Sequence, residues 1–475
     1  MAHFLNFING KWVDSPQSIE VEDPATQIII GTVACAKEAE VNQAVMAARA
    51  CVDRGDLSKP RPAQRVSWLL RIADEILKLK AQGAPLLVAE NGKTLSDAFA
   101  EFENAARYFQ YYAGMADKIE GRSIPLGEDF IDFTIYEPLG VSAQIVPWNF
   151  PVDIAARSLA PALAAGNAVV IKSPELTPLA ITLLAKACEN AQLPVGAVNM
   201  ICGYGHEAGT ALVGHGEIDQ IVFTGSVPTG QSILRAAADR ALPCVMELGG
   251  KSAAVVFPDA DLDVFIDSVD WGIFFNGGQV CSAMSRVLVH QDIHAQVVSQ
   301  VTALAKQQVV GHGSESSTTL TPVSSLMQRN KVIELCAASV QQGAHIVTGG
   351  RAVDRLGYFV EPTIIDGVSP ENDLFREEVF GPVLAITTFS TEEEAWQLAN
   401  ATDFGLVNGI FTNDLNIALR GAKALKCGQV FVNEWYAGGV ETPFGGVKMS
   451  GYGREKGQEA LYSYVQTKNV AIKLI

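Results

Sequence analysis

Two residues of different chemical character each lie next to a pair of glycines. Cys281 follows one pair in the run WGIFFNGGQVCSAMSR, and Glu247 precedes another in VMELGGK. A thiol is a nucleophile only when ionised, and a carboxylate can remove a proton from a thiol or from water. Glycines leave room for a reactant beside each side chain. We therefore predict a cysteine nucleophile served by a carboxylate base; inert packing of Cys281 and a turn or cap role for Glu247 are the alternatives.

Asn149 lies in a loop whose backbone is restricted on both sides. The segment IVPWNFP places Asn149 between two prolines and next to Trp148 and Phe150. Proline fixes its own backbone dihedral and restricts the residue before it, so the Asn149 amide is expected to be rigid in apolar surroundings. A rigid amide donor can stabilise a developing oxyanion. An ordinary turn role is the alternative.

A strand, a turn and the start of a helix are predicted at IVFTGSVPTG, residues 221–230. Backbone N–H groups in the first turn of a helix attract anions, and Ser226 after Gly225 adds a hydroxyl donor. The segment resembles a dinucleotide phosphate loop, although its glycine spacing is neither GxGxxG nor that of a P-loop. A plain strand-to-helix connection is therefore the alternative to a phosphate site.

A second binding edge is predicted at VVIKSPELTP, residues 169–178. Lys172 ends a predicted strand and Glu175 precedes a predicted helix, which places both at the carboxyl edge of a parallel sheet. A carboxylate there can accept hydrogen bonds from both ribose hydroxyls and would repel a 2′-phosphate. The arrangement favours NAD over NADP, which stays possible, and a simple helix N-terminal charge is the alternative role for Glu175.

The composition excludes several classes of function. Of the 475 residues, 48% are hydrophobic and 18% are charged, which is typical of a folded protein of several domains. A formal net charge of −17 disfavours nucleic acid and anionic membranes as partners. We expect neither a membrane-spanning helix nor a secretory signal. The eight cysteines lack metal-ligand spacing, so we expect no metal site and free thiols in the cytoplasm.

Short apolar runs alternate with helical stretches from Val141 onward. VSAQIVP, NAVVIK, AVNMIC, IDQIVF and SAAVVF are rich in β-branched residues, and PLAITLLAKACENA and GQSILRAAADRA between them have helical spacing. The alternation predicts an α/β fold with a parallel sheet covered on both faces. Upstream, helices are expected at residues 60–80 and 101–116. A second α/β lobe is expected after Lys251, with strands at RVLVH, HIVTGG, PVLAITTF and GQVFVN.

Two further segments alternate apolar and polar residues in the manner of half-buried strands. One covers residues 131–136, and the other is the chain end, SYVQTKNVAIKLI. A strand at a chain end must pair with an edge, so the second segment is a candidate oligomer contact. We expect a homodimer or a homotetramer.

Taken together, the motifs resemble those of the aldehyde dehydrogenase superfamily over nearly the whole chain. The match begins at INGKWVDS and runs through PWNFP, KSPELTP, FTGSVPTG, ELGGK, FFNGGQVCSAMSR, EEVFGPV and PFGGVKMSGYGRE. ELGGK and GGQVC in this order and separation are highly specific to that family. The resemblance implies a Rossmann-like NAD-binding domain at 1–115 and 139–249, an α/β catalytic domain at 250–447, and small oligomerisation strands at 116–138 and 458–475.

The resemblance also implies catalytic roles. Cys281 matches the nucleophile, Glu247 the general base, and Asn149 with the backbone N–H of Cys281 the oxyanion hole. Glu455, in GYGRE, matches a position that joins a proton path in some members. The implied reaction is the irreversible, NAD(P)-dependent oxidation of an aldehyde to a carboxylic acid, through a Cys281 thioester that Glu247-activated water hydrolyses.

A set of cofactor contacts follows from the same resemblance. It comprises Lys172 and Glu175 at the adenosine ribose, Gly225 and Ser226 at the pyrophosphate, Glu378 at the nicotinamide ribose, Phe380 beside the ring, and Trp148 as a further cofactor contact. Two other functions remain open: an acylating dehydrogenase that uses coenzyme A, and a non-catalytic NAD-binding structural protein. The presence of the base Glu247 argues against the first, and the complete catalytic set argues against the second.

The substrate is expected to be an aldehyde of one of two kinds. Asp153 and Arg157 are four residues apart on a predicted helix, so Arg157 is either paired with Asp153 or free to bind an acidic or carbonyl-bearing tail. Alternatively, several aromatic residues form an apolar pocket for an aromatic aldehyde. The candidates are Phe150, Trp271, Phe275, Trp435 and Tyr436. Core packing is the other role open to these aromatic residues.

Overall fold

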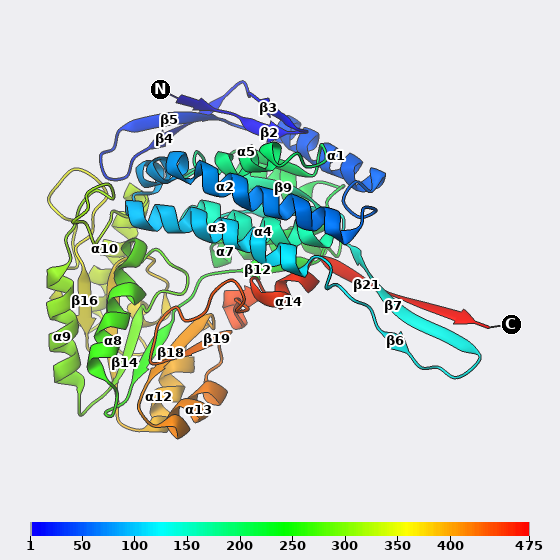
Figure 1. Cartoon of the computed structure of the whole chain (residues 1–475). Helices are drawn as coiled ribbons and strands as arrows, with labels where there is room; N and C mark the ends of the chain where they lie inside the picture. Colours follow the sequence, from blue (N-terminus) through cyan, green and yellow to red (C-terminus); the bar gives the residue numbers. More distant parts are fainter. Residues whose placement is uncertain (1, 475) are drawn as a thin grey trace.

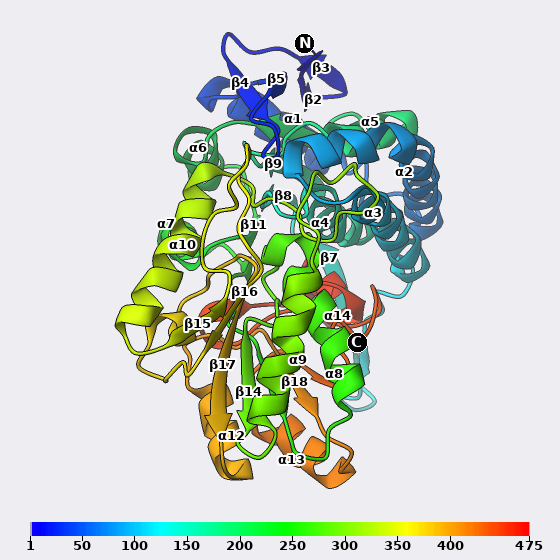
Figure 2. The ribbon, with the colours of Figure 1, turned by 90° about the vertical axis from the view of Figure 1, so that its left-hand side faces the viewer.

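The computed structural model describes residues 2–474. Two lobes, each an open sheet covered by helices, lie one above the other (Figures 1 and 2), and a narrow β-arm projects from the side (Figure 1). The α/β architecture predicted from the alternation of strands and helices is confirmed. No helix in the described part of the chain is both long and apolar enough to cross a membrane.

The first lobe contains an eight-stranded sheet in the order β20-β12-β11-β8-β9-β10-β2-β3. Its strands are β2 (Asn6–Ile8), β3 (Lys11–Val13), β8 (Val141–Ile145), β9 (Ala168–Ser173), β10 (Val198–Cys202), β11 (Gln220–Thr224), β12 (Cys244–Glu247) and β20 (Gly451–Tyr452). Strands β8 to β12 run parallel, and the chain leaves β8 first toward β9 and β10 and later returns to β11 and β12. A crevice therefore opens at the carboxyl ends of β8 and β11, where the winding direction reverses.

The first seven helices of the chain lie around this sheet, some directly on it and others packed on those helices. They are α1 (Glu38–Arg54), α2 (Pro62–Asn91), α3 (Leu95–Met115), α4 (Pro151–Ala165), α5 (Thr182–Asn190), α6 (Thr210–Gly214) and α7 (Val227–Ala238). The helix expected at 60–80 continues to Asn91 because apolar residues on the same face, such as Leu87, stay buried. Gly92 then ends it in the left-handed region, at φ 92°. Helices α2 and α3 lie side by side in Figures 1 and 2.

The second lobe contains a seven-stranded sheet in the order β15-β16-β17-β14-β13-β18-β19. Its strands are β13 (Ala253–Val256), β14 (Arg286–His290), β15 (His345–Thr348), β16 (Thr363–Asp366), β17 (Val383–Phe389), β18 (Val407–Phe411) and β19 (Gln429–Val432). Its helices are α8 (Leu262–Val269), α9 (His294–Gln307), α10 (Leu326–Gln341), α11 (Asp373–Arg376), α12 (Glu392–Asn400) and α13 (Leu415–Ala424). Every pair except β15–β16 is parallel.

After the second lobe, the chain returns to the first. Strand β20 pairs with β12, so Gly451 lies opposite Glu247, and α14 (Gly457–Tyr462) packs on α4. Four short helical turns complete the helices: η1 (Gly205–Gly209), η2 (Asp270–Phe274), η3 (Phe275–Gly278) and η4 (Lys448–Ser450). The return brings the Gly-rich segment 442–455 beside the strand that ends in Glu247.

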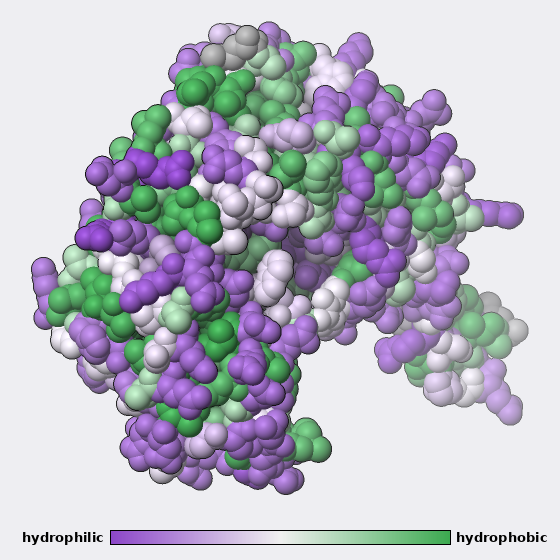
Figure 3. All heavy atoms as spheres, turned by 60° about the vertical axis from the view of Figure 1, so that its left-hand side comes forward, coloured by the Kyte–Doolittle hydropathy of each residue, from purple (hydrophilic) through white to green (hydrophobic). Residues whose placement is uncertain are grey.

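The arm is a three-stranded antiparallel sheet in the order β21-β7-β6. It consists of β6 (Ser123–Ile124), β7 (Phe130–Pro138) and β21 (Val465–Lys473). Figure 3 shows the arm standing away from the body, with hydrophobic and hydrophilic atoms both on its surface. A further small sheet in the order β1-β5-β4, formed by β1 (Ala2–Phe4), β5 (Ile29–Ala34) and β4 (Ser18–Glu22), lies near the N-terminus.

Candidate active site

Cys281 is presented by a tight left-handed turn in η3. Asn276, Gly277 and Gly278 have φ values of 51°, 62° and 72°. Glycine adopts this region without strain, and asparagine tolerates it better than most residues. A side chain at Gly278 would also overlap the backbone of Gly381. The glycine pair is therefore required by the turn and by packing, and Cys281 comes out of the turn at the junction of the two lobes.

Cys281 lines two of three adjoining cavities. The aromatic cavity, of about 650 Å³, lies against α3 and α4. The bridging cavity, of about 170 Å³, is lined by Cys281, Glu247 and Glu378. It shares Trp148 with the sheet-edge cavity, of about 620 Å³, which lies at the carboxyl ends of β8 and β11. The thiol and the carboxylate predicted to work together therefore face one space, which continues into a larger cavity on either side.

Glu247 ends β12 and is 2% exposed. Neither of its carboxylate oxygens accepts a hydrogen bond from any group in the described part of the chain. Burial, followed by repulsion from the Glu455 carboxylate, raises the pKa of Glu247 well above its ordinary value, while Arg157 and Arg454 oppose the shift. A buried carboxyl of this kind can take a proton from a water molecule and return it, as a general base requires.

Burial also controls the thiol of Cys281. The side chain is only partly exposed, and burial raises its pKa to about 12, with Glu378 and Glu247 adding to the shift and Arg157 opposing it. The thiol is therefore protonated at neutral pH in this state of the protein. Its ionisation depends on a proton acceptor or on a positive charge placed in the same space.

Asn149 is fixed through both its backbone and its side chain. Its carbonyl oxygen accepts hydrogen bonds from Lys93 Nζ at 3.1 Å and from Asn276 Nδ2 at 3.2 Å. Its own Nδ2 donates to the Gln279 carbonyl at 2.9 Å. Among the described residues, no other acceptor takes the second N–H of that amide, and Asn149 lines the cavities on both sides of Cys281. The amide can therefore donate to an oxygen formed beside the thiol.

Glu378 and Phe380 close the far side of the bridging cavity. Glu378 Oε1 accepts a hydrogen bond from the Gly250 N–H at 3.0 Å, and burial raises the pKa of the carboxyl. A side chain at Gly249 would overlap that carboxylate, and one at Gly250 would overlap the backbone carbonyl of Cys281, so both positions of the second glycine pair are closely packed. The Phe380 ring meets the Trp148 ring edge to face, with centroids 5.4 Å apart.

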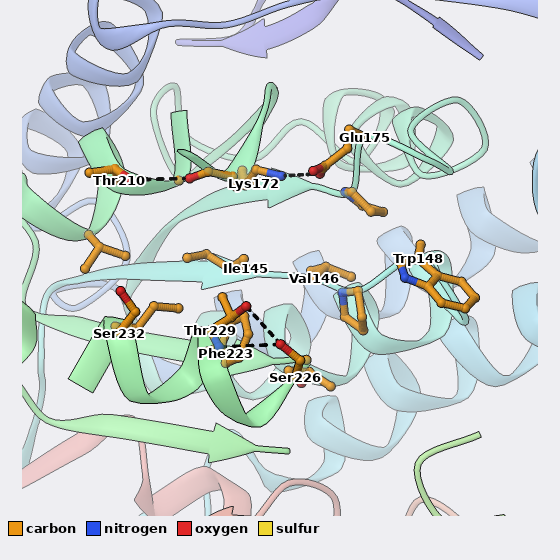
Figure 4. A pocket seen from close by; sticks show the side chains of 18 of the residues that line it. Ile145, Val146, Trp148, Lys172, Glu175, Thr210, Phe223, Ser226, Thr229 and Ser232 are labelled. Atoms are coloured by element: carbon orange, nitrogen blue, oxygen red, sulfur yellow. Dashed lines mark hydrogen bonds and ion pairs between the residues drawn. The ribbon is translucent and has the colours of Figure 1, made fainter. Parts of the chain in front are cut away.

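The sheet-edge cavity has polar groups suited to a dinucleotide. Lys172 Nζ pairs with Glu175 Oε2 at 2.9 Å on one side, and Ser226 caps the N-terminus of α7 on the other, next to Thr229 (Figure 4). The exposed amides at the start of α7 attract phosphate, and the Glu175 carboxylate can accept from ribose hydroxyls. Apolar side chains, including Ile233, line the same cavity and can take a flat base. The residues that line this cavity therefore fit NAD, the dinucleotide that the sequence predicts.

The aromatic cavity is walled by rings that contact one another. Phe150 and Phe275 stack with centroids 5.7 Å apart and planes at 29°. Phe275 also contacts Trp271 at 5.8 Å and Tyr436 at 6.3 Å. All four rings line the cavity, and Trp271 is 60% exposed at its mouth. The wall formed by these rings can accommodate a flat or bulky apolar group next to Cys281.

The pairing of Arg157 with Asp153, one of the two possibilities left open by the sequence, is wrong. Arg157 forms its ion pair with Glu455, which also accepts a hydrogen bond from Ser158 Oγ at 3.0 Å. Asp153 instead accepts from the Tyr108 hydroxyl at 3.4 Å. Arg157 and Glu455 are both almost fully buried, so neither a free Arg157 nor an Asp153–Arg157 pair is present.

The assignment of Trp435 to the substrate pocket is also wrong. Trp435 is 4% exposed and is not among the described residues that line the aromatic cavity. Its Nε1 donates to the Ser282 carbonyl at 3.1 Å, and its ring fills the space over Gly409 in β18. Trp435 therefore supports the segment after Cys281, and its neighbour Tyr436 lines the cavity in its place.

Several residues at the site were not identified from the sequence. Lys93 and Glu101 form a buried ion pair against the Asn149 loop, and Asn91 donates to the Trp148 carbonyl at 2.9 Å. In the second lobe, Gln328 Nε2 donates to the Phe380 carbonyl at 2.9 Å, and Lys331 donates to that of Glu378. These side chains hold backbone atoms of distant segments. No motif in the sequence marks a residue for that role.

A protein-family model matches nearly the whole chain. Residues 12–470 match the model of the aldehyde dehydrogenase family. Human retinal dehydrogenase 2 is 40% identical over 473 residues, covering 98% of this chain and 91% of that protein. The pea peroxisomal aminoaldehyde dehydrogenase 1 is also 40% identical, covering 98% and 94%. The chain therefore belongs to the aldehyde dehydrogenase family.

Solved structures agree with the assignment. The NAD⁺ complex of an aldehyde dehydrogenase from Bacillus cereus superposes with a TM-score of 0.98, at 36% identity, over 100% of this chain and 97% of that one. A betaine aldehyde dehydrogenase from Staphylococcus aureus in complex with NAD⁺ superposes with a TM-score of 0.97, at 36% identity, over 99% and 95%. The family and the fold expected from the sequence motifs are thus confirmed.

Alkylation of Cys281 tests the ionisation of the thiol. Without added nucleotide, its reaction with iodoacetamide should be slow at pH 7 and should accelerate about tenfold per pH unit up to pH 9, because the thiolate fraction rises in this way below the pKa. Mass spectrometry of the peptide containing Cys281 measures the rate, and Cys281→Ala identifies the modified peptide. Fast alkylation that is independent of pH between 6 and 8 would contradict a raised pKa.

Proposed function

We propose that the chain oxidises aldehydes to carboxylic acids with NAD, through a covalent intermediate on Cys281 that water hydrolyses. The observation that carries the proposal is the bridging cavity, where Cys281, Glu247, Asn149 and Glu378 face one another. This cavity leads to the sheet-edge cavity on one side and shares Cys281 with the aromatic cavity on the other. A nucleophile, a base and an oxyanion donor lie together between a nucleotide site and a substrate site.

The first step uses the thiol and the Asn149 amide. The ionised Cys281 Sγ attacks the aldehyde carbon, and the carbonyl oxygen becomes an alkoxide. Asn149 Nδ2 and the Cys281 backbone N–H donate to this oxygen, and one such donor contributes about 3–4 kcal/mol to the transition state. Because the Asn149 amide is already fixed by the Gln279 carbonyl, little reorganisation is needed when the charge forms.

The next step removes hydride from the former aldehyde carbon. NAD, when bound, supplies the hydride acceptor, and an acyl thioester stays on Cys281. The residues proposed to hold the cofactor are Trp148, Lys172, Glu175, Gly225, Ser226, Glu378 and Phe380. Each lines the sheet-edge cavity or the bridging cavity. The Glu175 carboxylate beside Lys172 supports a preference for NAD over NADP, because it would repel a 2′-phosphate.

Hydrolysis of the thioester uses Glu247. Its carboxylate takes a proton from water, which attacks the acyl carbon, and the carboxylic acid leaves as Cys281 regains a proton. Because neither carboxylate oxygen is engaged by the described residues, a water molecule entering the cavity meets an available acceptor. A buried acceptor beside the thiol supports hydrolysis over transfer of the acyl group to coenzyme A.

The substrate is proposed to be an aromatic or bulky apolar aldehyde. The contacting rings of Phe150, Phe275 and Tyr436 support an apolar pocket. Arg157, the candidate for holding an acidic tail, is already paired with Glu455. Lys456 lines the same cavity and is the one lysine that an acidic substrate could reach there among the described residues. Replacement of Lys456 therefore distinguishes an acidic substrate from an apolar one.

We also propose that the chain forms a homo-oligomer and works in a reducing compartment. Strand β21 pairs with β7 along one edge, and its other edge pairs with no strand of the described chain, which supports a dimer or tetramer contact. All eight cysteines are free, which supports the cytoplasm or another reducing compartment.

Substitution of the base and the nucleophile should separate the two halves of the reaction. Glu247→Gln should release about one equivalent of NADH per site and then turn over about 10²–10⁴-fold more slowly, because hydrolysis loses its base. Cys281→Ala should show no burst and should retain NAD binding. Stopped-flow absorbance of NADH measures both. A normal steady-state rate for Glu247→Gln, or acceleration of the native chain by coenzyme A, would contradict the hydrolytic mechanism.

Removal of the Glu175 carboxylate should change the choice of cofactor. Glu175→Ala should lower the NAD/NADP ratio of kcat/KM about tenfold or more, because a repulsive charge is lost and Lys172 is freed to attract a 2′-phosphate. Glu207→Ala is the matched control, since Glu207 pairs with Lys37 outside this cavity. An unchanged ratio in Glu175→Ala would contradict the proposed contact.

A substrate panel tests the aromatic cavity. The kcat/KM for benzaldehyde should exceed that for succinic semialdehyde about tenfold or more. Phe275→Ala should lower the benzaldehyde value about tenfold and leave acetaldehyde nearly unchanged, because stacking on that ring is lost. If succinic semialdehyde is preferred and Lys456→Met removes that preference, the substrate is acidic and the aromatic assignment is wrong.

A further inference from the structure

A buried ion pair outside the reacting groups lies against the Asn149 loop. Lys93 follows the end of α2 and is 0% exposed, and its Nζ pairs with Glu101 in α3. Transferring two charges from water to the interior is costly, and such a pair often contributes nothing net to stability. The contacts of the two side chains indicate a role other than stability.

Lys93 contacts the Asn149 peptide directly. Its Nζ donates to the Asn149 carbonyl at 3.1 Å and lies 4.1 Å from the centroid of the Phe150 ring. The ammonium group thus holds the oxyanion donor through its backbone and the first ring of the aromatic cavity through its face. A donor at this carbonyl restrains rotation of the peptide that carries the Asn149 side chain.

Glu101 fixes the chain three and four residues after Asn149. Its Oε1 accepts from the backbone N–H groups of Val152 and Asp153 at 2.8 and 3.2 Å, in the first turn of α4. These are N–H groups without partners inside the helix, and a carboxylate there is favoured by the helix dipole. The carboxylate therefore ties the start of α4 to α3, while its second oxygen holds Lys93.

The second lobe supplies the opposing contacts. Asn276 Nδ2 donates to the same Asn149 carbonyl at 3.2 Å, and the Gln279 carbonyl accepts from Asn149 Nδ2 at 2.9 Å. Without Lys93, the Asn149 peptide would keep its contacts to the Cys281 turn and would lose its ammonium contact to the first lobe. Asn91 Nδ2, at 3.4 Å, would then be the remaining first-lobe donor to that carbonyl, and the side-chain amide would be held less firmly in its direction toward the oxygen that forms beside Cys281.

We propose that Lys93 and Glu101 are positioning residues that set the direction of the Asn149 amide for oxyanion stabilisation. The inference rests on the oxyanion role proposed above for Asn149. Lys93 and Glu101 make no hydrogen bond or ion pair to Cys281, although Glu101 lines the aromatic cavity, so we expect their effect on oxyanion formation to pass through Asn149. This dependence distinguishes positioning from a general contribution to folding.

A double-mutant cycle with Asn149→Ala tests the dependence. In the full chain, Glu101→Gln and Lys93→Met should each lower the single-turnover rate of NADH formation from benzaldehyde about tenfold, with the Kd for NAD unchanged. In the Asn149→Ala background, the same substitutions should have less than a twofold effect, because the group that they position is absent. Lys80→Met is the matched control: Lys80 pairs with Glu103 between the same two helices on the surface, and its loss should leave the rate unchanged.

Three results would overturn the proposal. Multiplicative effects with Asn149→Ala would show that the pair acts independently of the amide, as a structural element does. A change confined to the KM for aromatic aldehydes would assign the effect to Phe150. Failure of both Lys93→Met and Glu101→Gln to fold would show that the pair is needed by the fold as a whole. A native chain that oxidises no aldehyde with NAD would instead refute the proposed function.

Discussion

The contact that the site depends on is made at one peptide carbonyl, that of Asn149. It accepts hydrogen bonds from Lys93 in the first lobe and from Asn276 in the second. This one oxygen therefore links the two lobes at the point where a substrate would react. Hydrogen bonds to a carbonyl are directional, and a displacement of one lobe would break at least one of them. The relative position of the thiol and the amide is therefore set by backbone contacts as well as by the reactive side chains.

Around this contact, the site concentrates buried acidic groups. Glu247 and Glu378 both line the bridging cavity, Glu455 lies close enough to raise the pKa of Glu247, and burial raises the pKa of Glu378 as well. The Arg157 guanidinium lowers the pKa of both the thiol and Glu247, Arg454 also acts on Glu247, and Lys331 and Lys251 act on Glu378. Because every charge there is poorly solvated, a bound ligand that changes the local charge will shift several of these groups together.

The sequence predicts the parts of this protein that are carried by short motifs. Cys281 and Glu247 were identified because their glycine neighbours are local, and the parallel sheets follow from the strand–helix alternation. The partner of Arg157 was not predicted, because Glu455 is 298 residues away and reaches it only through the return of the chain to β12. Trp435 was misplaced because an aromatic residue in a loop has the same pattern whether it packs inward or faces a cavity. Lys93 was missed because its role is to hold a distant backbone oxygen.

The return of the chain to β12 bears on how the protein is made. The sheet of the first lobe is completed by β20, which is synthesised only after all of the second lobe, so β12 has an unpaired edge while residues 253–432 emerge. Unpaired edges invite pairing with other chains, and contacts of such long sequence separation form late. Nascent chains that stop within the second lobe are thus expected to expose the strand that ends in Glu247 to aggregation and to chaperones.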